Sequence, residues 1–163
     1  MKAQVWSIDT AFSIAIFLTA LLMIFFSINT ISNDIMINKE LESINTLTLS
    51  ISDALVRLPG FPKDWNRTTV RVLGLARDEN ILDEYKVSEM LDIDYDTLRV
   101  ATGAGKYNIH ISLFYINGSI AKDSYGRNIT AGLLPTNPDY ISRMERYCIY
   151  RGELTKLRIS LWY

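Results

Sequence analysis

The sequence contains very few of the residues that build disulfides, zinc sites or cysteine-based catalytic pairs. Among its 163 residues there is one cysteine, Cys148, and one histidine, His110. A lone cysteine cannot close a disulfide within the chain. A standard zinc site needs more ligands than these two residues, and a Cys–His nucleophile pair would require them to meet in the fold. We therefore expect no metal ion, no cofactor and no catalytic residue, and we predict that the protein is not an enzyme.

The sequence also lacks an excess of positive charge. It has 17 lysines and arginines against 18 aspartates and glutamates, which gives a formal net charge of -1 at pH 7. Nucleic-acid binding usually needs a clustered excess of Lys and Arg side chains that neutralise phosphates. We therefore expect no nucleic acid among the partners of this protein.

Two short motifs that could suggest a phosphate or calcium site are incomplete. The motif "TGAGK" (102–106) is not a Walker A loop, because Val100 stands where glycine is needed and Tyr107 stands where Ser or Thr is needed. The motif "DIDYD" (92–96) has the alternating carboxylates of a calcium loop but lacks its glycine and its final glutamate. We interpret the first motif as a turn before a strand, and the second as an acidic turn in which Asp94 caps a helix.

A long apolar run lies near the N-terminus. Residues 10–33 include no charged side chain, and residues 10–28 consist mainly of Ala, Ile, Leu, Phe and Met. About 20 apolar residues in a helix span the hydrocarbon core of a bilayer, whereas the apolar part of a secretory signal has about 7–15 residues. The stretch "SINTISNDIM" at the end of the run contains no convincing A-x-A-like cleavage site. We predict a transmembrane segment over about residues 10–32.

The charges on either side of this segment predict its orientation. Lys2 and the amino terminus lie before it, whereas Asp34, Glu40 and Glu42 lie after it. Because positively charged residues tend to stay on the cytoplasmic side, we expect the N-terminus in the cytoplasm. The bulk of the protein should then lie outside the cell, anchored to the cell membrane.

The helical pattern continues beyond the apolar run. Apolar residues recur at alternating steps of four and three, until Pro59 and the turn-forming residues after it end the pattern. We predict one helix over residues 4–58, which is first membrane-spanning and then amphipathic. The apolar stripe either packs against the protein's own head or contacts other helices in a filament, and both can hold at once. The stripe consists of Ile37, Leu41, Ile44, Thr48, Ile51, Leu55 and Leu58.

Residues 60–163 predict a small α+β head with a mainly antiparallel sheet. Residues 68–75 form a short β-rich run, and residues 107–117 alternate between apolar and polar side chains. The C-terminal residues predict two strands that are joined around residues 151–153. The apolar face of the strand within residues 107–117 consists of Ile109, Ile111, Leu113 and Tyr115. The apolar face of the last strand consists of Leu157, Ile159 and Leu161.

Two other parts of the head have weaker patterns. Residues 86–101 predict a short helix or a pair of turns. Residues 117–139 are polar and rich in turn-forming residues, so we predict a long surface excursion there.

The sequence "KAQVWSID" (2–9), followed by the apolar run, resembles the class III signal of archaeal type IV pilin-like proteins. In that family a prepilin-peptidase-type enzyme cuts after a small residue that is preceded by a basic one. The mature chain then begins with Gln, and Ser and an acid follow shortly. The resemblance implies that residues 1–3 are a short leader, that Lys2, Ala3 and Gln4 form the processing site, and that Asp9 is the acid.

Asp9 lies at the edge of the apolar run, where an ionised carboxylate in lipid is costly and normally has a partner. The resemblance implies that this partner is the freed amino terminus of a neighbouring subunit during assembly. The alternatives are that Asp9 is an acid at the membrane interface, or the N-cap of a helix that begins beside Thr10.

The resemblance also implies a structural function. We expect a major or minor subunit of a type IV pilus-like surface filament, anchored in the membrane before it assembles with identical or related subunits. Its partners would be the membrane, those subunits and the prepilin-peptidase-type enzyme. The alternative is a bitopic membrane-anchored surface protein whose head binds a ligand or a partner.

Three sequons for N-linked glycosylation fall in predicted turns of the head. They begin at Asn66, Asn117 and Asn128, and each has Ser or Thr two residues later. The pattern is short and occurs often by chance, but the common placement in outer loops favours an exported, glycosylated surface. We treat all three asparagines as candidate glycosylation sites.

Overall fold

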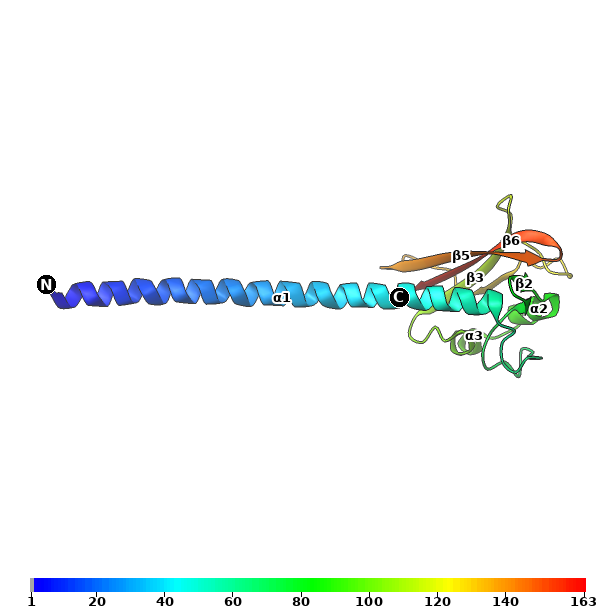
Figure 1. Ribbon diagram of the computed structural model, residues 1–163, viewed down its shortest axis with the longest axis horizontal. Helices are drawn as coiled ribbons and strands as arrows, with labels where there is room; N and C mark the ends of the chain where they lie inside the picture. The colour runs from blue at the N-terminus through cyan, green and yellow to red at the C-terminus, as the bar shows by residue number, and fades with distance from the viewer. Residues whose placement is uncertain (1) are drawn as a thin grey trace. The chain divides into compact units, whose positions relative to one another are not determined.

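The computed structural model describes the backbone of residues 2–163 and the side chains of residues 9–28, 35 and 38–163 (Figure 1). The protein is α+β, as the sequence predicted, with an N-terminal apolar helix and one six-stranded sheet.

The N-terminal helix α1 runs from Lys2 to Arg57. The chain divides into two compact units, Met1–Glu42 and Ser43–Tyr163, and α1 contributes residues to both. The helix ends one residue before the predicted end at Leu58, because Pro59 disfavours helical conformation in the residue before it. The unit Ser43–Tyr163 is the head, and it includes the end of α1 as well as the predicted head residues 60–163.

The sheet of the head has the strand order β1-β2-β5-β6-β3-β4. Its centre consists of three long antiparallel strands, whereas β1, β2 and β4 have two or three residues each. The sequence predicted a mainly antiparallel sheet, and among the strands that the structure describes only β2 and β5 pair in parallel. The strands are β1 (Ala76–Asp78), β2 (Ile81–Leu82), β3 (Asn108–Tyr115), β4 (Thr130–Gly132), β5 (Ile141–Tyr150) and β6 (Glu153–Trp162).

The predicted C-terminal hairpin is confirmed. Strands β5 and β6 are joined by Arg151 and Gly152, whose φ angles are +54° and +78°. A two-residue turn with positive φ at both positions matches the twist of the flanking strands, and glycine adopts it without steric cost. The predicted inward face of β6 is also confirmed, because Leu157, Ile159 and Leu161 are 0% exposed.

Two short helices follow β2. Helix α2 covers Glu84–Leu91 and helix α3 covers Tyr95–Thr102, so the prediction of a short helix or turns in this region is confirmed as two helices. Asp94 caps α3, as predicted, by accepting a hydrogen bond from the backbone N–H of Thr97 at 2.9 Å. This hydrogen bond lowers the pKa of Asp94 below its ordinary value.

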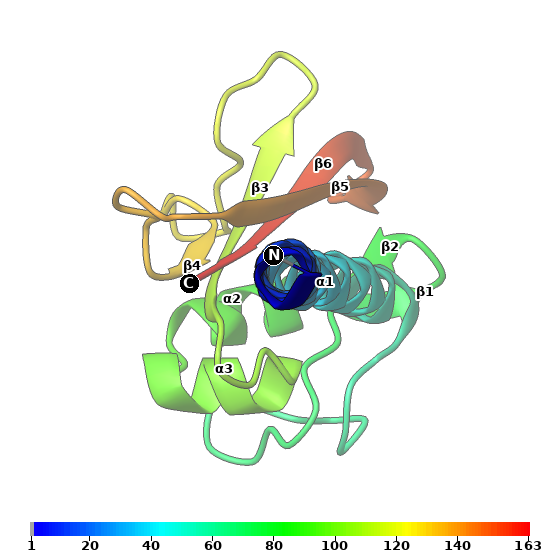
Figure 2. The ribbon, with the colours of Figure 1, turned by 90° about the vertical axis from the view of Figure 1, so that its left-hand side faces the viewer.

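The end of α1 forms part of the hydrophobic core of the head. Ile44, Ile51, Leu55 and Val56 are at most 4% exposed and pack with apolar residues of the sheet and of α2 and α3. Within the head, the last turns of α1 lie between the sheet and the α2–α3 pair (Figure 2). The predicted packing of the stripe against the head is therefore confirmed for the part from Ile44 to Leu55.

Leu58 is an exception within the predicted stripe. It is 51% exposed, because α1 ends at Arg57 and the helical periodicity no longer determines where the Leu58 side chain lies. The side chain of Ile37 lies outside the described residues, and Leu41 is half-buried.

Polar contacts join the end of α1 to strand β5. The side-chain oxygen of Asn45 accepts a hydrogen bond from the Ser142 hydroxyl at 2.7 Å. Further along, Arg146 forms an ion pair with Asp53 at 3.0 Å and donates to the Ser52 hydroxyl at 3.1 Å. Such contacts fix the rotation of the helix against the sheet, because each pairs a specific helix position with a specific strand position.

The strand predicted over residues 68–75 is wrong. The N–H groups of Leu73 and Leu75 donate to the backbone oxygens of Ala101 and Leu55, at 2.8 Å and 3.0 Å, and not to a neighbouring strand. The β-rich composition was therefore misleading, because these residues bond separately to α3 and α1, and the antiparallel pairing of Val72 with Phe61 is an isolated bridge outside the named strands.

Trp65 anchors the loop that follows α1. Its side chain is 0% exposed, and its indole N–H donates to the backbone oxygens of Pro59 and Gly74, at 3.1 Å and 3.0 Å. The two ends of the loop touch, since a Cβ on Gly74 would lie 2.3 Å from the backbone nitrogen of Gly60. Only glycine permits so close an approach of two backbones.

The predicted surface excursion over residues 117–139 is partly wrong. It contains strand β4, which pairs with β3. Ala121, Asp123 and Ile129 in this segment are at most 3% exposed. Its polar composition hides these buried positions, of which Ala121 and Ile129 belong to the hydrophobic core.

Candidate functional site

The apolar part of α1 is the first candidate site. The segment Asp9–Ile28 has 20 residues and is long and apolar enough to cross a membrane. At 1.5 Å per residue it covers about 30 Å, which matches the hydrocarbon core of a bilayer. None of its side chains is buried by the protein, and Phe12, Phe17 and Met23 are 65%, 64% and 71% exposed. An apolar surface of this size needs lipid or another protein surface to cover it.

The polar groups within this segment include Thr19, whose hydroxyl donates to the backbone oxygen of Ile16 at 2.8 Å. A hydroxyl bound to its own helix backbone has no unmet hydrogen bond in an apolar environment. This contact therefore lets α1 carry a threonine within an apolar environment.

Asp9 lies at the start of the apolar segment with an exposed side chain. It is inside α1, which begins at Lys2, so the alternative that Asp9 is a helix N-cap is wrong. A role at the membrane interface and a role in assembly both stay predictions.

The predicted processing residues Lys2, Ala3 and Gln4 lie in the first turns of α1. Their side chains are outside the described residues. The cleavage between Ala3 and Gln4 stays a prediction.

The structure places the three candidate glycosylation sites in separate parts of the head. Asn66 is half-buried in the loop after α1, Asn117 is exposed in the turn after β3, and Asn128 is exposed immediately before the buried residue Ile129. Glycosylation stays a prediction for each.

His110 and Cys148 lie on opposite faces of the sheet. His110 pairs with Ser160, whereas Cys148 pairs with Thr155 and contacts its hydroxyl at 3.4 Å. Directly paired residues share a face, and positions 155 and 160 of β6 differ by an odd number, so they face opposite sides. Burial lowers the pKa of His110 and raises that of Cys148, so each favours its neutral form. The two residues do not form a pair, and no metal-holding group of His, Cys, Asp or Glu exists among the residues the structure describes.

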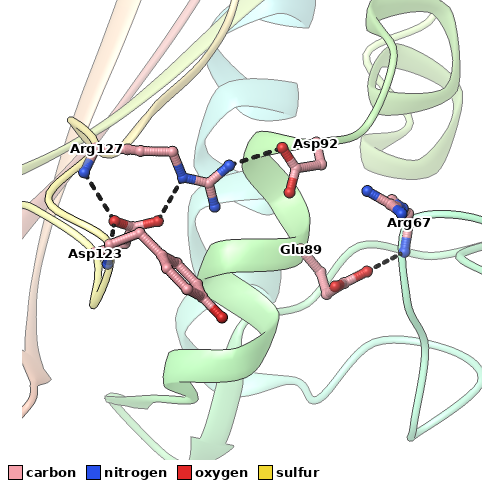
Figure 3. A network of polar contacts seen from close by, with 6 residues as sticks. Arg67, Glu89, Asp92, Asp123 and Arg127 are labelled. Atoms are coloured by element: carbon pink, nitrogen blue, oxygen red, sulfur yellow. Dashed lines mark hydrogen bonds and ion pairs between the residues drawn. The ribbon is translucent and has the colours of Figure 1, made fainter.

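A polar network that the sequence did not predict joins α2 to the turn before β4 (Figure 3). The Arg127 guanidinium donates to Asp123 and to Asp92, each at 2.8 Å. Beside it, Glu89 accepts a hydrogen bond from the backbone N–H of Arg67 at 2.9 Å. The network links three segments that are distant in the sequence, which is why no local pattern could have revealed it.

Asp123 is the buried member of this network, with 3% of its surface exposed. Burial acts to raise its pKa, but hydrogen bonds from Arg127 and from the backbone N–H of Tyr125 outweigh burial and hold the pKa below its ordinary value. The carboxylate is therefore stabilised in its ionised form by the fold.

We expect Asp123→Asn to destabilise the head by about 1.5–3 kcal/mol at pH 7, because a charge-assisted hydrogen bond to Arg127 is lost. Since the folded pKa is lowered, the stabilising contribution of Asp123 is present above its unfolded pKa of about 4 and is lost as the pH falls through the folded value. The difference between wild type and variant should shrink below about pH 4. Urea unfolding at a series of pH values measures it.

The control for this experiment is Asp92→Asn. Asp92 binds the same arginine, but its side chain is 36% exposed, so its loss should cost about 1 kcal/mol or less. Equal costs for the two variants would contradict the role given to burial.

Comparisons of the chain with protein-family models, with curated proteins and with solved structures found no significant match.

Proposed function

We propose that the protein is a subunit of a type IV pilus-like surface filament and that α1 holds it in the membrane before assembly. The observation that carries the proposal is the composition of α1. One helix contains an apolar segment that the protein does not cover and, further along, the residues that complete the core of the head.

The continuity of α1 favours an assembly role over simple anchoring. Residues 2–57 contain no glycine and no proline, the two residues that most readily interrupt helices. A membrane anchor needs only about 20 apolar residues and tolerates a flexible link to its head. A helix that must pack along its length with neighbouring helices benefits from remaining unbroken, because its apolar face then keeps one register.

The proposal includes a topology and a processing step. The N-terminus lies in the cytoplasm, the head lies outside the cell, and a prepilin-peptidase-type enzyme removes residues 1–3. In the assembled filament the apolar segment is covered by the same segment of identical or related subunits. The contact is heterologous, so it repeats without closing and the filament grows.

The test is the N-terminal residue of the protein isolated from its native membrane. We expect Gln4, and we expect Ala3→Leu to keep residues 1–3 attached, because the bulky side chain blocks the peptidase. Val5→Leu is the matched control, since it places the same side chain after the bond and should leave cleavage intact. Peptide mass spectrometry of the N-terminus distinguishes these products.

Two outcomes would contradict the proposal. A wild-type protein that keeps Met1 would favour the bitopic anchored surface protein, whose head binds a ligand or partner. A chain that begins after residue 28 would instead identify the apolar segment as a cleaved secretory signal.

A further inference from the structure

The three sequons share a sequence pattern but have two different conformations. In the sequons of Asn66 and Asn117, the third residue donates hydrogen bonds to the asparagine side chain. In the sequon of Asn128, the third residue belongs to strand β4. We propose that the folded head accepts an N-linked oligosaccharide at Asn117 and at Asn66, and that the fold prevents modification of Asn128.

Asn117 lies at the tip of a hairpin. The turn is closed by hydrogen bonds from Gly118 N–H to the backbone oxygen of Tyr115 and from Tyr115 N–H to that of Ser119, both at 2.9 Å. The Asn117 side-chain oxygen accepts hydrogen bonds from the Ser119 N–H at 2.9 Å and from its hydroxyl at 2.7 Å. All three residues of the sequon are exposed, so an enzyme can reach them without any change in the fold.

Asn66 has the same local geometry. Its side-chain oxygen accepts hydrogen bonds from the Thr68 N–H at 2.9 Å and from the Thr68 hydroxyl at 2.7 Å. It accepts two further hydrogen bonds from Thr69. Asn66 is half-buried, whereas Arg67 and Thr68 are exposed. The sequon therefore presents its second and third residues to solvent, as the sequon of Asn117 does.

This geometry suits the chemistry of the transfer. A bond forms between the asparagine Nδ2 and the anomeric carbon of an oligosaccharide carried on a lipid phosphate, and the bond from that carbon to the phosphate oxygen breaks. The lipid phosphate leaves with the bonding electron pair, and Nδ2 gives up a proton to a base of the oligosaccharyltransferase. Hydrogen bonds on Oδ1 stabilise the negative charge that develops there as Nδ2 loses its proton.

In both sequons the nitrogen that must react makes no hydrogen bond to another group of the described part of the protein. Within the part of the chain that the structure describes, Nδ2 of Asn66 and Nδ2 of Asn117 donate no hydrogen bond.

The sequon of Asn128 is held in the sheet instead. The N–H of Ile129 donates to Ala121 at 2.9 Å, and the backbone oxygen of Ile129 accepts from Leu113 at 3.1 Å. Ile129 is 1% exposed and belongs to the hydrophobic core. The N–H of Thr130 donates to the backbone oxygen of Asn128 at 3.0 Å and not to its side chain. To take the conformation of the other two sequons, this segment would have to leave β3 and expose Ile129.

The experiment compares folded protein with peptides of the same sequence. Full-length protein from a host without N-glycosylation is incubated, folded in detergent micelles, with a lipid-phosphate-linked oligosaccharide and a single-subunit oligosaccharyltransferase. Synthetic peptides that cover residues 62–72, 113–123 and 124–134 are treated in the same way. Glycopeptide mass spectrometry over a time course gives a rate for each asparagine in each form.

We expect all three peptides to be modified, because none of them has a strand to hold it. In the folded protein, Asn117 and Asn66 should be modified at rates within about tenfold of their peptides. Asn128 should react at least about 100-fold more slowly than its peptide, because its reaction waits for local opening of the sheet. Asn117→Gln and Asn66→Gln should each remove one oligosaccharide mass, and Asn128→Gln should remove none.

Two results would overturn the inference. One is modification of Asn128 in the folded protein at the rate of its peptide. The other is a folded protein in which Asn117 or Asn66 remains unmodified while its peptide reacts. Neither result depends on cleavage before Gln4 or on filament assembly, so the inference and the proposed function can fail separately. Modification of Asn66 and Asn117 in the cell requires the head to lie outside, and this one point rests on the proposed function.

Discussion

Residues 60–163 without the end of α1 should not fold cooperatively, whereas residues 43–163 should unfold in a single transition. The removed residues include Ile44, Ile51, Leu55 and Val56, which are buried in the core. At about 1.5–3 kcal/mol for each buried side chain, their transfer from water contributes about 6–12 kcal/mol. This is comparable with the whole net stability of a domain, which is about 5–15 kcal/mol.

Loss of the helix also removes hydrogen-bonding partners from the head. The N–H groups of Leu75 and Asn80 donate to the backbone oxygens of Leu55 and Val56, at 3.0 Å and 2.9 Å. In the shorter fragment these N–H groups would lose their partners, and those that stay buried would each cost about 1–3 kcal/mol. The end of α1 therefore stabilises the core, the backbone of the loop that follows it and the turn between β1 and β2.

Thermal unfolding of the two fragments, followed by circular dichroism, measures this difference. Equal melting temperatures would contradict the packing of α1 within the head. A point-mutation control in residues 43–163 uses Leu55→Ala and Leu58→Ala. The first side chain is 1% exposed and its loss should cost about 2–5 kcal/mol, whereas the second is 51% exposed and should cost about 0.5 kcal/mol or less.

The parts of the fold that the sequence predicted well are those with a local physical cause. The alternation in residues 107–117 predicted β3 and its inward face, because side chains of a strand alternate between two faces. The sharp turn between β5 and β6 follows from a glycine where positive φ is needed. The end of α1 follows from Pro59.

The parts that the sequence did not predict depend on distant partners. The loop after α1 has the composition of a strand, but its conformation is set by Trp65 and by contact between Gly60 and Gly74. The short strands β1 and β2 have too few residues for any periodicity to be visible. In the same way, Arg127 lies 35 residues from Asp92, so only the folded chain brings these two together.

The candidate sites also divide into features with a local cause, which the sequence predicted, and features that depend on distant partners. The sequence alone identifies Asn66, Asn117 and Asn128 as sequons, because the motif is local. It treats the three alike, since the burial of Ile129 arises from its pairing with other segments. The apolar segment of α1 was predictable from composition, and its lack of cover within the protein required the structure.

Asp9→Ala should sharply reduce the number of surface filaments while leaving membrane insertion and cleavage intact. Asp9 is exposed at the start of the apolar segment, where a carboxylate in lipid or in a helical bundle needs a partner. In the proposed filament that partner is the amino group of Gln4 on a neighbouring subunit, freed by cleavage. Removing one member of a desolvated pair costs about 3–5 kcal/mol, and each 1.4 kcal/mol changes an association constant tenfold.

The measurement is the yield of filaments sheared from cells, counted by electron microscopy and probed for this protein, with wild type and Asp9→Ala compared at equal expression. Glu42→Ala is the matched control, because Glu42 is an exposed acid of the same helix that lies beyond the apolar segment. It should leave the yield unchanged. In a permanent anchor, by contrast, Asp9→Ala would slightly favour insertion and change nothing else, since removal of a charge lowers the cost of entering lipid. Equal filament yields from wild type and Asp9→Ala would therefore exclude the assembly role of Asp9. If cells make no filaments although the mature chain begins at Gln4, the protein is a minor or non-polymerising subunit.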